Sequence, residues 1–95
     1  YTEGVICSEP KVNLQYGDAE FYISKDGKGM NADGTGDPAN TIKVYQNYYL
    51  NKDKYTDANK DLIKKGQKVV ICGKPLLYNG VTPEINSGNY IVSIK

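Results

Sequence analysis

The chain has 95 residues, enough for one small domain with a modest core. Its 12 basic residues are all lysine, and with 11 acidic residues the net charge is +1, which excludes a strongly basic nucleic-acid binder. The absence of arginine excludes bidentate recognition of guanine or phosphate, and the absence of histidine removes the usual general base and the commonest metal ligand. No apolar run reaches about 18 residues, so we expect no membrane-spanning helix in this segment.

The lysines are concentrated in the second half of the chain. Residues 1–50 hold four lysines and seven acidic residues, whereas residues 51–95 hold eight lysines and four acidic residues. This basic half is compatible with weak attraction to a polyanion or with an ordinary solvated lysine surface. The chain begins at Tyr1 within an apparent strand and without an initiator methionine. We therefore expect residues 1–95 to form a single domain taken from a longer chain.

The first half predicts two strands and a long loop. Residues 1–8 form the first predicted strand, which ends at Glu9-Pro10 because proline cannot donate to a ladder. A connection through Tyr16-Gly17-Asp18 leads to the second predicted strand, residues 19–25. Alternation predicts that one set of its side chains faces the core: Ala19, Phe21 and Ile23. The other set is predicted to face outward: Glu20, Tyr22 and Ser24.

Residues 27–40 form a glycine-rich loop that is long for a domain of this size. Asn31, Asp33, Thr35 and Gly36 faintly resemble the start of a calcium-binding loop. The bidentate glutamate that closes such a loop is missing, because Ile42 stands there. We expect a flexible hairpin tip rather than a metal site.

The second half predicts a short helix between strands. Residues 41–50 form the third predicted strand. Thr56 is a suitable N-cap, and Lys64-Lys65-Gly66 is a suitable end for a short helix. Residues 68–78 form the fourth predicted strand, which a turn at Asn79-Gly80 ends. A short extended piece, 82–85, precedes the fifth predicted strand, 90–94.

The element order and the glycine positions resemble those of the OB-fold, a five-stranded Greek-key barrel with a helix between strands three and four. Gly4 lies where the first strand of such domains bends. Residues 21–27 resemble the strand and Asp-Gly turn between strands two and three. Residues 65–74, Lys-Gly-Gln-Lys-Val-Val-Ile-Cys-Gly-Lys, resemble the entry to strand four. The sequence therefore predicts an all-β OB-fold barrel with one short helix.

Three further stretches are similar to OB-fold domains of Bacteroidetes secreted proteins and lipoproteins. These stretches are residues 15–19, residues 48–50, and residues 82–84 together with 89–91. This resemblance implies a nucleic-acid-binding role. It also implies a location outside the cytoplasm, at the cell surface or in the periplasm, with a lipid anchor on a preceding segment.

OB-folds bind ligands on the outer face of strands two and three, between the loops that follow strands one and four. That face is predicted to carry an aromatic and basic set, together with its flanking loops: Tyr16, Tyr22, Lys25, Lys43, Tyr45, Lys74 and Tyr78. Tyrosine rings stack on bases and lysines follow phosphates, a combination typical of weak, sequence-tolerant single-strand binding. Alternatively, Tyr22 and Tyr45 form a cross-strand pair that only stiffens the sheet. A second hypothesis is an accessory module of a surface or secreted protein that binds a glycan or a partner protein.

Cys7 and Cys72 lie on strands that are neighbours in such a barrel. They are candidates for a disulfide in an oxidising compartment, or for two unpaired thiols packed as small hydrophobic groups. The candidate acids show no spacing that would hold two of them together: Glu20, Asp26, Asp33, Asp37 and Glu84. We therefore expect a chain with no enzymatic activity, no cofactor and no metal.

Overall fold

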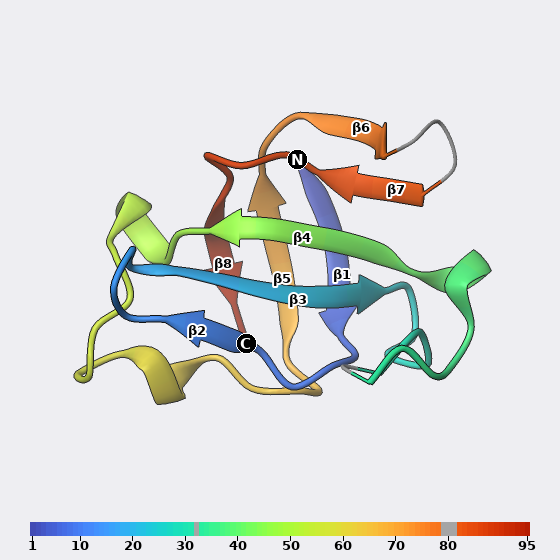
Figure 1. Cartoon of the computed structure of the whole chain (residues 1–95), viewed down its shortest axis with the longest axis horizontal. Coiled ribbons are helices and arrows are strands. Elements are labelled where there is room, and N and C mark those ends of the chain that lie inside the picture. Colours follow the sequence, from blue (N-terminus) through green and yellow to red (C-terminus); the bar gives the residue numbers. More distant parts are fainter. Residues whose placement is uncertain (32, 79–81) are drawn as a thin grey trace.

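The computed structural model describes residues 1–31, 33–78 and 82–95, and within these ranges the side chains of Pro38, Tyr78 and Thr82 are not described. Figure 1 shows a chain built mainly of strands, which confirms the predicted β class. The described strands are β1 (Thr2–Ile6), β2 (Lys11–Asn13), β3 (Asp18–Ser24), β4 (Ile42–Asn47), β5 (Lys68–Cys72), β6 (Pro75–Tyr78), β7 (Thr82–Ile85) and β8 (Tyr90–Ile94). Three short 3₁₀ turns join them: η1 (Pro38–Asn40), η2 (Leu50–Lys52) and η3 (Lys60–Leu62).

The strands form one sheet that folds over on itself. β1 pairs antiparallel with β3 on one edge and with β5 on the other. β3 continues to β4, and β5 continues to β8, again antiparallel. In Figure 1, β3 and β4 cross in front of β1, β5 and β8. The sheet therefore has two layers, whose inner surfaces enclose the core.

Two additions extend the front layer. β2 pairs with the outer edge of β3 over Lys11–Asn13. β6 and β7 form an antiparallel hairpin, and β7 attaches it to β4 by a short parallel ladder in which Lys43 is opposite Glu84. Both additions border the outward surface of β3 and β4, so they define the walls of any site on that surface.

β8, the last strand of the sheet, also contacts the chain just beyond β4. Tyr48, just beyond β4, forms a parallel bridge with Tyr90 at the start of β8. The Tyr48 amide donates to the Asn89 carbonyl (2.9 Å), and the Ile91 amide donates to the Tyr48 carbonyl (3.0 Å). We call this contact the seam.

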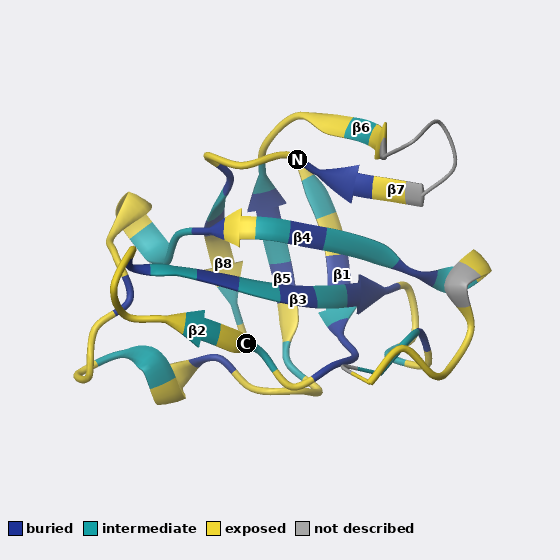
Figure 2. Cartoon of the chain, viewed as in Figure 1, coloured by how far each residue is buried: buried dark blue, intermediate teal, exposed yellow. Residues whose placement is uncertain are grey.

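The core follows the predicted alternation. Ala19, Phe21 and Ile23 of β3 are at most 2% exposed, which confirms the inward set predicted for this strand. The remaining buried apolar side chains of the same cluster come from both layers and two connections: Ile6, Val44, Tyr55, Ile63, Val69, Ile71, Ile85 and Ile91. Figure 2 shows the buried positions alternating along β3 and β5 with more exposed ones.

A buried polar network lies beside this core near the seam. Asn47 and Asn89 are fully buried, and Asn47 Nδ2 donates to Asn89 Oδ1 (2.8 Å). The Tyr55 hydroxyl donates to Asn47 Oδ1 (2.5 Å). Asn89 Nδ2 donates to the Tyr45 carbonyl (2.7 Å) and the Asn86 carbonyl (2.7 Å). Each buried amide thus has partners, and the network joins β4, the segment that follows η2 and the connection between β7 and β8.

The predicted helix after Thr56 is wrong. Among the described residues of this segment there is only the 3₁₀ turn η3, although Thr56 Oγ1 does accept from the Ala58 amide (3.2 Å) as a cap would. A short helix in water depends on packing an apolar face. Here Ile63 is buried, but Leu62 is 51% exposed and Ala58 is exposed, so such a face has nothing to pack against.

The prediction of five strands is also wrong, because the described chain has eight. The predicted strand 68–78 breaks into β5 and β6 at Gly73. A Cβ on Gly73 would lie 2.5 Å from Asn89 Cβ and 2.7 Å from Ile85 Cγ2, so the chain turns there against β7 and the residues before β8. β2 and β7 were predicted as a connection and a short extended piece. The predicted Asn79-Gly80 turn lies outside the described residues.

Candidate functional site

The outward surface of β3 and β4 brings three of the predicted binding residues together. Tyr22 is opposite Lys43 in the ladder, and Tyr45 follows on the same side of β4. All three side chains are partly exposed, whereas their neighbours Phe21 and Val44 point into the core. Lys43 Nζ lies 5.6 Å from the centre of the Tyr45 ring, within the range of a cation–π contact.

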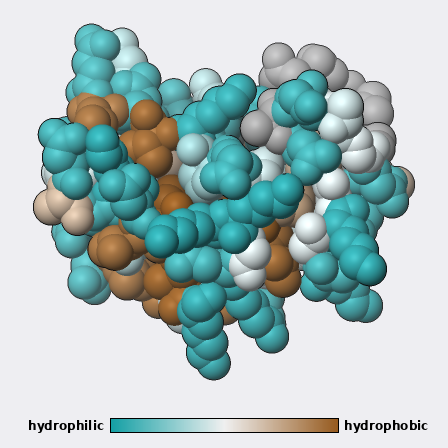
Figure 3. Space-filling model, turned by 90° about the horizontal axis from the view of Figure 1, so that it is seen from below, coloured by the Kyte–Doolittle hydropathy of each residue, from teal (hydrophilic) through white to brown (hydrophobic). Residues whose placement is uncertain are grey.

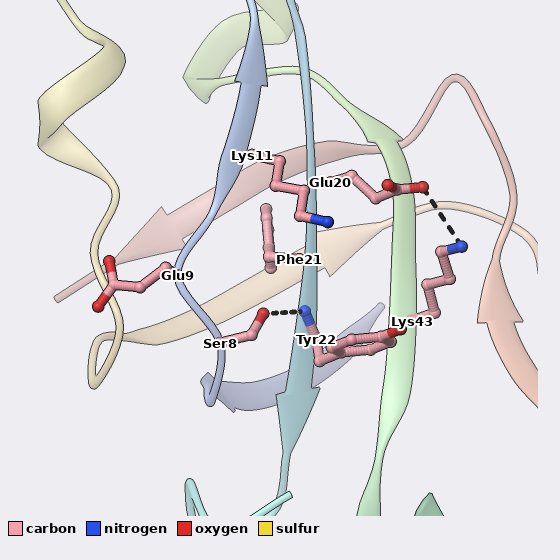
Figure 4. Close-up of a pocket in the computed structure, with 7 residues that line it drawn as sticks. All are labelled: Ser8, Glu9, Lys11, Glu20, Phe21, Tyr22 and Lys43. Atoms are coloured by element: carbon pink, nitrogen blue, oxygen red, sulfur yellow. Dashed lines mark hydrogen bonds and ion pairs between the residues drawn. The ribbon is translucent and has the colours of Figure 1, made fainter. Parts of the chain in front are cut away.

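Lys43 is also an ion-pair partner, which sequence analysis did not predict. Its Nζ lies 3.4 Å from a carboxylate oxygen of Glu20, as Figure 4 shows. Glu84, on β7, is opposite Lys43 and only 8% exposed. Partial burial lowers the pKa of Lys43, but the Glu20 carboxylate, followed by Tyr22 and Glu84, outweighs burial, so the pKa lies above its usual value. The positive charge of Lys43, the central lysine of this surface, is therefore balanced by carboxylates of the same protein.

Two hollows lie along β3 on this surface. The first has a volume of about 30 Å³, roughly the room of one water molecule, and lies beside Tyr22 and Lys43 (Figure 4). The second, about 260 Å³, is large enough for a sugar ring and lies between β2 and β4. We call this second hollow the β2–β4 groove; its lining residues are Lys11, Val12, Asn13, Asp18, Glu20, Tyr45 and Gln46.

The groove is rich in hydrogen-bonding groups and contains more carboxylates than lysines. Asp18 and Glu20 supply the acids, Asn13 and Gln46 supply amides, and Lys11 is its lysine. Burial and, secondly, the nearby Glu20 carboxylate raise the pKa of Asp18. The groove thus offers acceptors and a tyrosine ring to a ligand, and repels a phosphate.

The other predicted binding residues flank this surface. Tyr16 is 61% exposed in the turn between β2 and β3. Lys25 is exposed just beyond β3, where it borders a separate hollow of about 420 Å³. Lys74 is exposed in the connection between β5 and β6. Tyr78 ends β6, and its side chain lies outside the described part of the structure.

The glycine-rich loop is held by its own side chains. Asp33 Oδ1 accepts from the Thr35 hydroxyl (2.6 Å) and the Thr35 amide (2.9 Å). Both bonds lower the pKa of Asp33, and the bond from the hydroxyl has the larger effect. Asp26 Oδ1 accepts from the Lys28 amide (2.9 Å) and from Asn40 Nδ2 (2.9 Å). Within the described ranges, no group of three or more potential ligands among Cys, Asp and Glu is placed to hold a metal ion.

Cys7 and Cys72, the candidates for a disulfide or for two unpaired thiols, are both free thiols in the structure. The ladder of β1 with β5 runs from Thr2 opposite Ile71 to Val5 opposite Lys68, so the two cysteines lie beyond opposite ends of it. Cys7 is buried, with 1% of its surface exposed. Gly29 of the glycine-rich loop packs so closely against it that a Cβ there would lie 3.0 Å from Cys7 Sγ.

The acids of the surface are what sequence analysis missed. The sequence showed no spacing that would give Glu20 or Glu84 a partner. The alternation along residues 19–25 had already put Glu20 on the side of Tyr22, but the neighbour of Glu84 depends on a parallel ladder between distant segments.

On the underside, Figure 3 shows apolar surface between hydrophilic side chains. A hollow of about 440 Å³ includes Val12 and Ile63 among its lining residues.

Comparisons of the chain with protein-family models, with curated proteins and with solved structures found no match. None of the helical segments that the structure describes is long and apolar enough to cross a membrane.

Proposed function

We propose that this chain is a non-catalytic binding module of the OB-fold type. The pairing of β1 with β3 and β5, of β3 with β4 and of β5 with β8 supports this assignment. The parallel bridge at the seam also supports it, since it joins the third and the last of these five strands. β2 and the β6–β7 hairpin then correspond to the two loops that flank the ligand face of the fold. With the resemblance noted in the sequence, this assignment favours a location outside the cytoplasm.

The ligand that the groove fits best is an uncharged saccharide. The observation that carries this proposal is the charge balance of the ligand face, where Asp18, Glu20 and Glu84 outnumber Lys11 and Lys43. Sugar hydroxyls donate to carboxylate and amide oxygens, and Tyr45 offers an amphipathic ring beside them. A polyanion would have to approach this acidic surface, which is electrostatically unfavourable.

A second candidate function is the binding of single-stranded nucleic acid on the same face. The observation that favours it is the placement of Tyr22 and Tyr45 on one side of adjacent strands, with Lys43 between them. Stacking on such rings contributes about 1–3 kcal/mol per base. For this function a phosphate must displace Glu20 from Lys43.

The two functions are separated by two titrations of the same protein. The first uses calorimetry with neutral cello-, xylo- and manno-oligosaccharides, and the second uses anisotropy with a labelled oligo-dT at low and at moderate salt. Saccharide binding that is insensitive to salt and is lost in Tyr45→Ala and Glu20→Gln supports the first function. Tyr16→Ala, which removes an exposed tyrosine outside the groove, is the matched control. Saccharide binding that is unchanged in both groove variants would exclude the β2–β4 groove as the binding site.

In the second titration, Glu20→Gln has the opposite expected effect. It releases Lys43 from its ion pair and removes a negative charge. Oligo-dT bound across Tyr22 and Tyr45 would therefore bind more tightly to this variant, whereas a saccharide that donates to Glu20 would bind less tightly. The same substitution thus discriminates between the two functions by the sign of its effect.

A further inference from the structure

A second cluster of tyrosine and lysine lies at the seam, where the chain beyond β4 meets β8. Its members, which we call the seam patch, are Tyr48, Lys52, Lys74 and Tyr90. In Figure 1, β8 lies behind β3 and β4, so the outward side of β8 does not border the β2–β4 groove. None of these residues lines the groove.

The parallel bridge determines how the two tyrosines lie. Residues paired in a ladder have their side chains on the same side. Asn47 and Ile91, the neighbours of Tyr48 and Tyr90, are fully buried, so both tyrosines point away from the core. Both remain partly exposed. The seam therefore presents two adjacent aromatic side chains on the molecular surface.

Lys52 lies over one of these two rings. Its Nζ lies 5.0 Å from the centre of the Tyr90 ring. Asn51 and Lys52 both adopt positive φ (61° and 62°), a conformation that asparagine tolerates and that is unfavourable for lysine. η2, which contains both residues, packs against β8. The local chain is thus strained in the turn that places a lysine above Tyr90.

Lys74 follows the strand that pairs with Tyr90. Cys72 is opposite Tyr90 in the ladder, Gly73 turns inward against Asn89, and Lys74 follows. Among the described residues, neither Lys52 nor Lys74 forms an ion pair with a carboxylate. Asp53 adjoins Lys52 in sequence but makes no such pair with it. The charge balance of this patch is therefore the reverse of that of the groove.

We propose that the seam patch binds single-stranded nucleic acid. Bases stack on Tyr48 and Tyr90, and the ammonium groups of Lys52 and Lys74 neutralise phosphates on either side of them. Aromatic rings between unpaired lysines fit such a strand because each repeating unit has one flat ring and one negative charge. The saccharide proposed for the groove has no part in this inference, so either one can fail alone.

The test is an anisotropy titration of the whole domain with a labelled oligo-dT of about ten nucleotides, a length within the range of single OB-folds. The double variant Lys52→Glu/Lys74→Glu is compared with Lys28→Glu/Lys64→Glu, which makes the same charge change at exposed lysines outside both the seam patch and the predicted binding set. We expect the seam variant to weaken binding at least about tenfold and the control less than about threefold. Because each single-strand phosphate contact contributes about 0.7 to the salt slope, the slope should fall by about 1.4 in the seam variant.

Tyr90→Leu is the second variant, since it removes the aromatic ring and keeps apolar bulk beside the core. Its fold is verified by its far-ultraviolet circular dichroism, and it should bind oligo-dT at least about fivefold more weakly than the wild type. Three results would overturn the proposal: no binding by the wild type at low salt, an equal loss in the control double variant, or a loss confined to Tyr22→Ala and Tyr45→Ala. The last result would assign the strand to the face of β3 and β4.

Discussion

Replacement of Asn89 by alanine should be among the most destabilising polar substitutions in this domain. Asn89 is fully buried and makes three short side-chain hydrogen bonds, to Asn47 (2.8 Å) and to the carbonyls of Tyr45 and Asn86 (2.7 Å each). At about 1 kcal/mol for each bond, the variant should lose about 3 kcal/mol of unfolding free energy, and more if the freed partners stay dry. That is a large part of the roughly 5–15 kcal/mol that stabilises an ordinary domain.

The assay is urea denaturation followed by circular dichroism, with Asn59→Ala as the matched control. Asn59 also makes two side-chain hydrogen bonds, to the Thr56 amide (2.7 Å) and the Lys54 carbonyl (3.2 Å), but both are exposed. Water replaces exposed partners, so the control should lose less than about 1 kcal/mol. Equal losses in the two variants would refute the reasoning that burial of the network makes its bonds indispensable.

Three further predictions concern the core, the alkaline limit and the thiols. Gly73→Ala should destabilise more than Gly4→Ala in the same urea assay, because the nearest atom to the new Cβ lies at 2.5 Å in the first case and at 3.1 Å in the second. Burial and, secondly, Tyr49 raise the pKa of Tyr55 above its usual value, so the unfolded state loses this proton first. Stability should therefore fall as the pH rises above about 10, less steeply in Tyr55→Phe; parallel curves would contradict this. Ellman's reagent should modify Cys72 before the buried Cys7 in the native protein and both in urea, whereas no reaction in urea would mean that the thiols are oxidised.

Local alternation predicted the layers of this fold well where a strand has one buried side. The inward set of β3 follows from periodicity alone. The predicted helix failed for a different reason. Thr56 accepts the hydrogen bond that a cap would accept, but this bond cannot hold a helix whose apolar side chains, such as Leu62, find no partner in the fold.

The candidate site depends on which residues stand opposite one another in paired strands, and the sequence alone does not give this register. Tyr22, Lys43 and Tyr45 were correctly placed on one surface, because alternation assigns the side of a strand on which each residue lies. Whether a lysine on that surface is available to a ligand depends on which residues stand opposite it. Glu84 is 41 positions away from Lys43 in sequence and reaches it only through the ladder of β4 with β7.

The same reasoning identifies the seam patch. Tyr48 and Tyr90 are brought together by a single parallel bridge, and Lys52 reaches Tyr90 through a turn with positive φ at two successive residues. No alternation in the sequence indicates either feature. The predicted chemistry, tyrosine rings beside lysines, therefore occurs both on the face of β3 and β4 and at the seam patch. Strand pairing brings carboxylates to the first surface, and this difference in charge should make the ligands of the two surfaces differ.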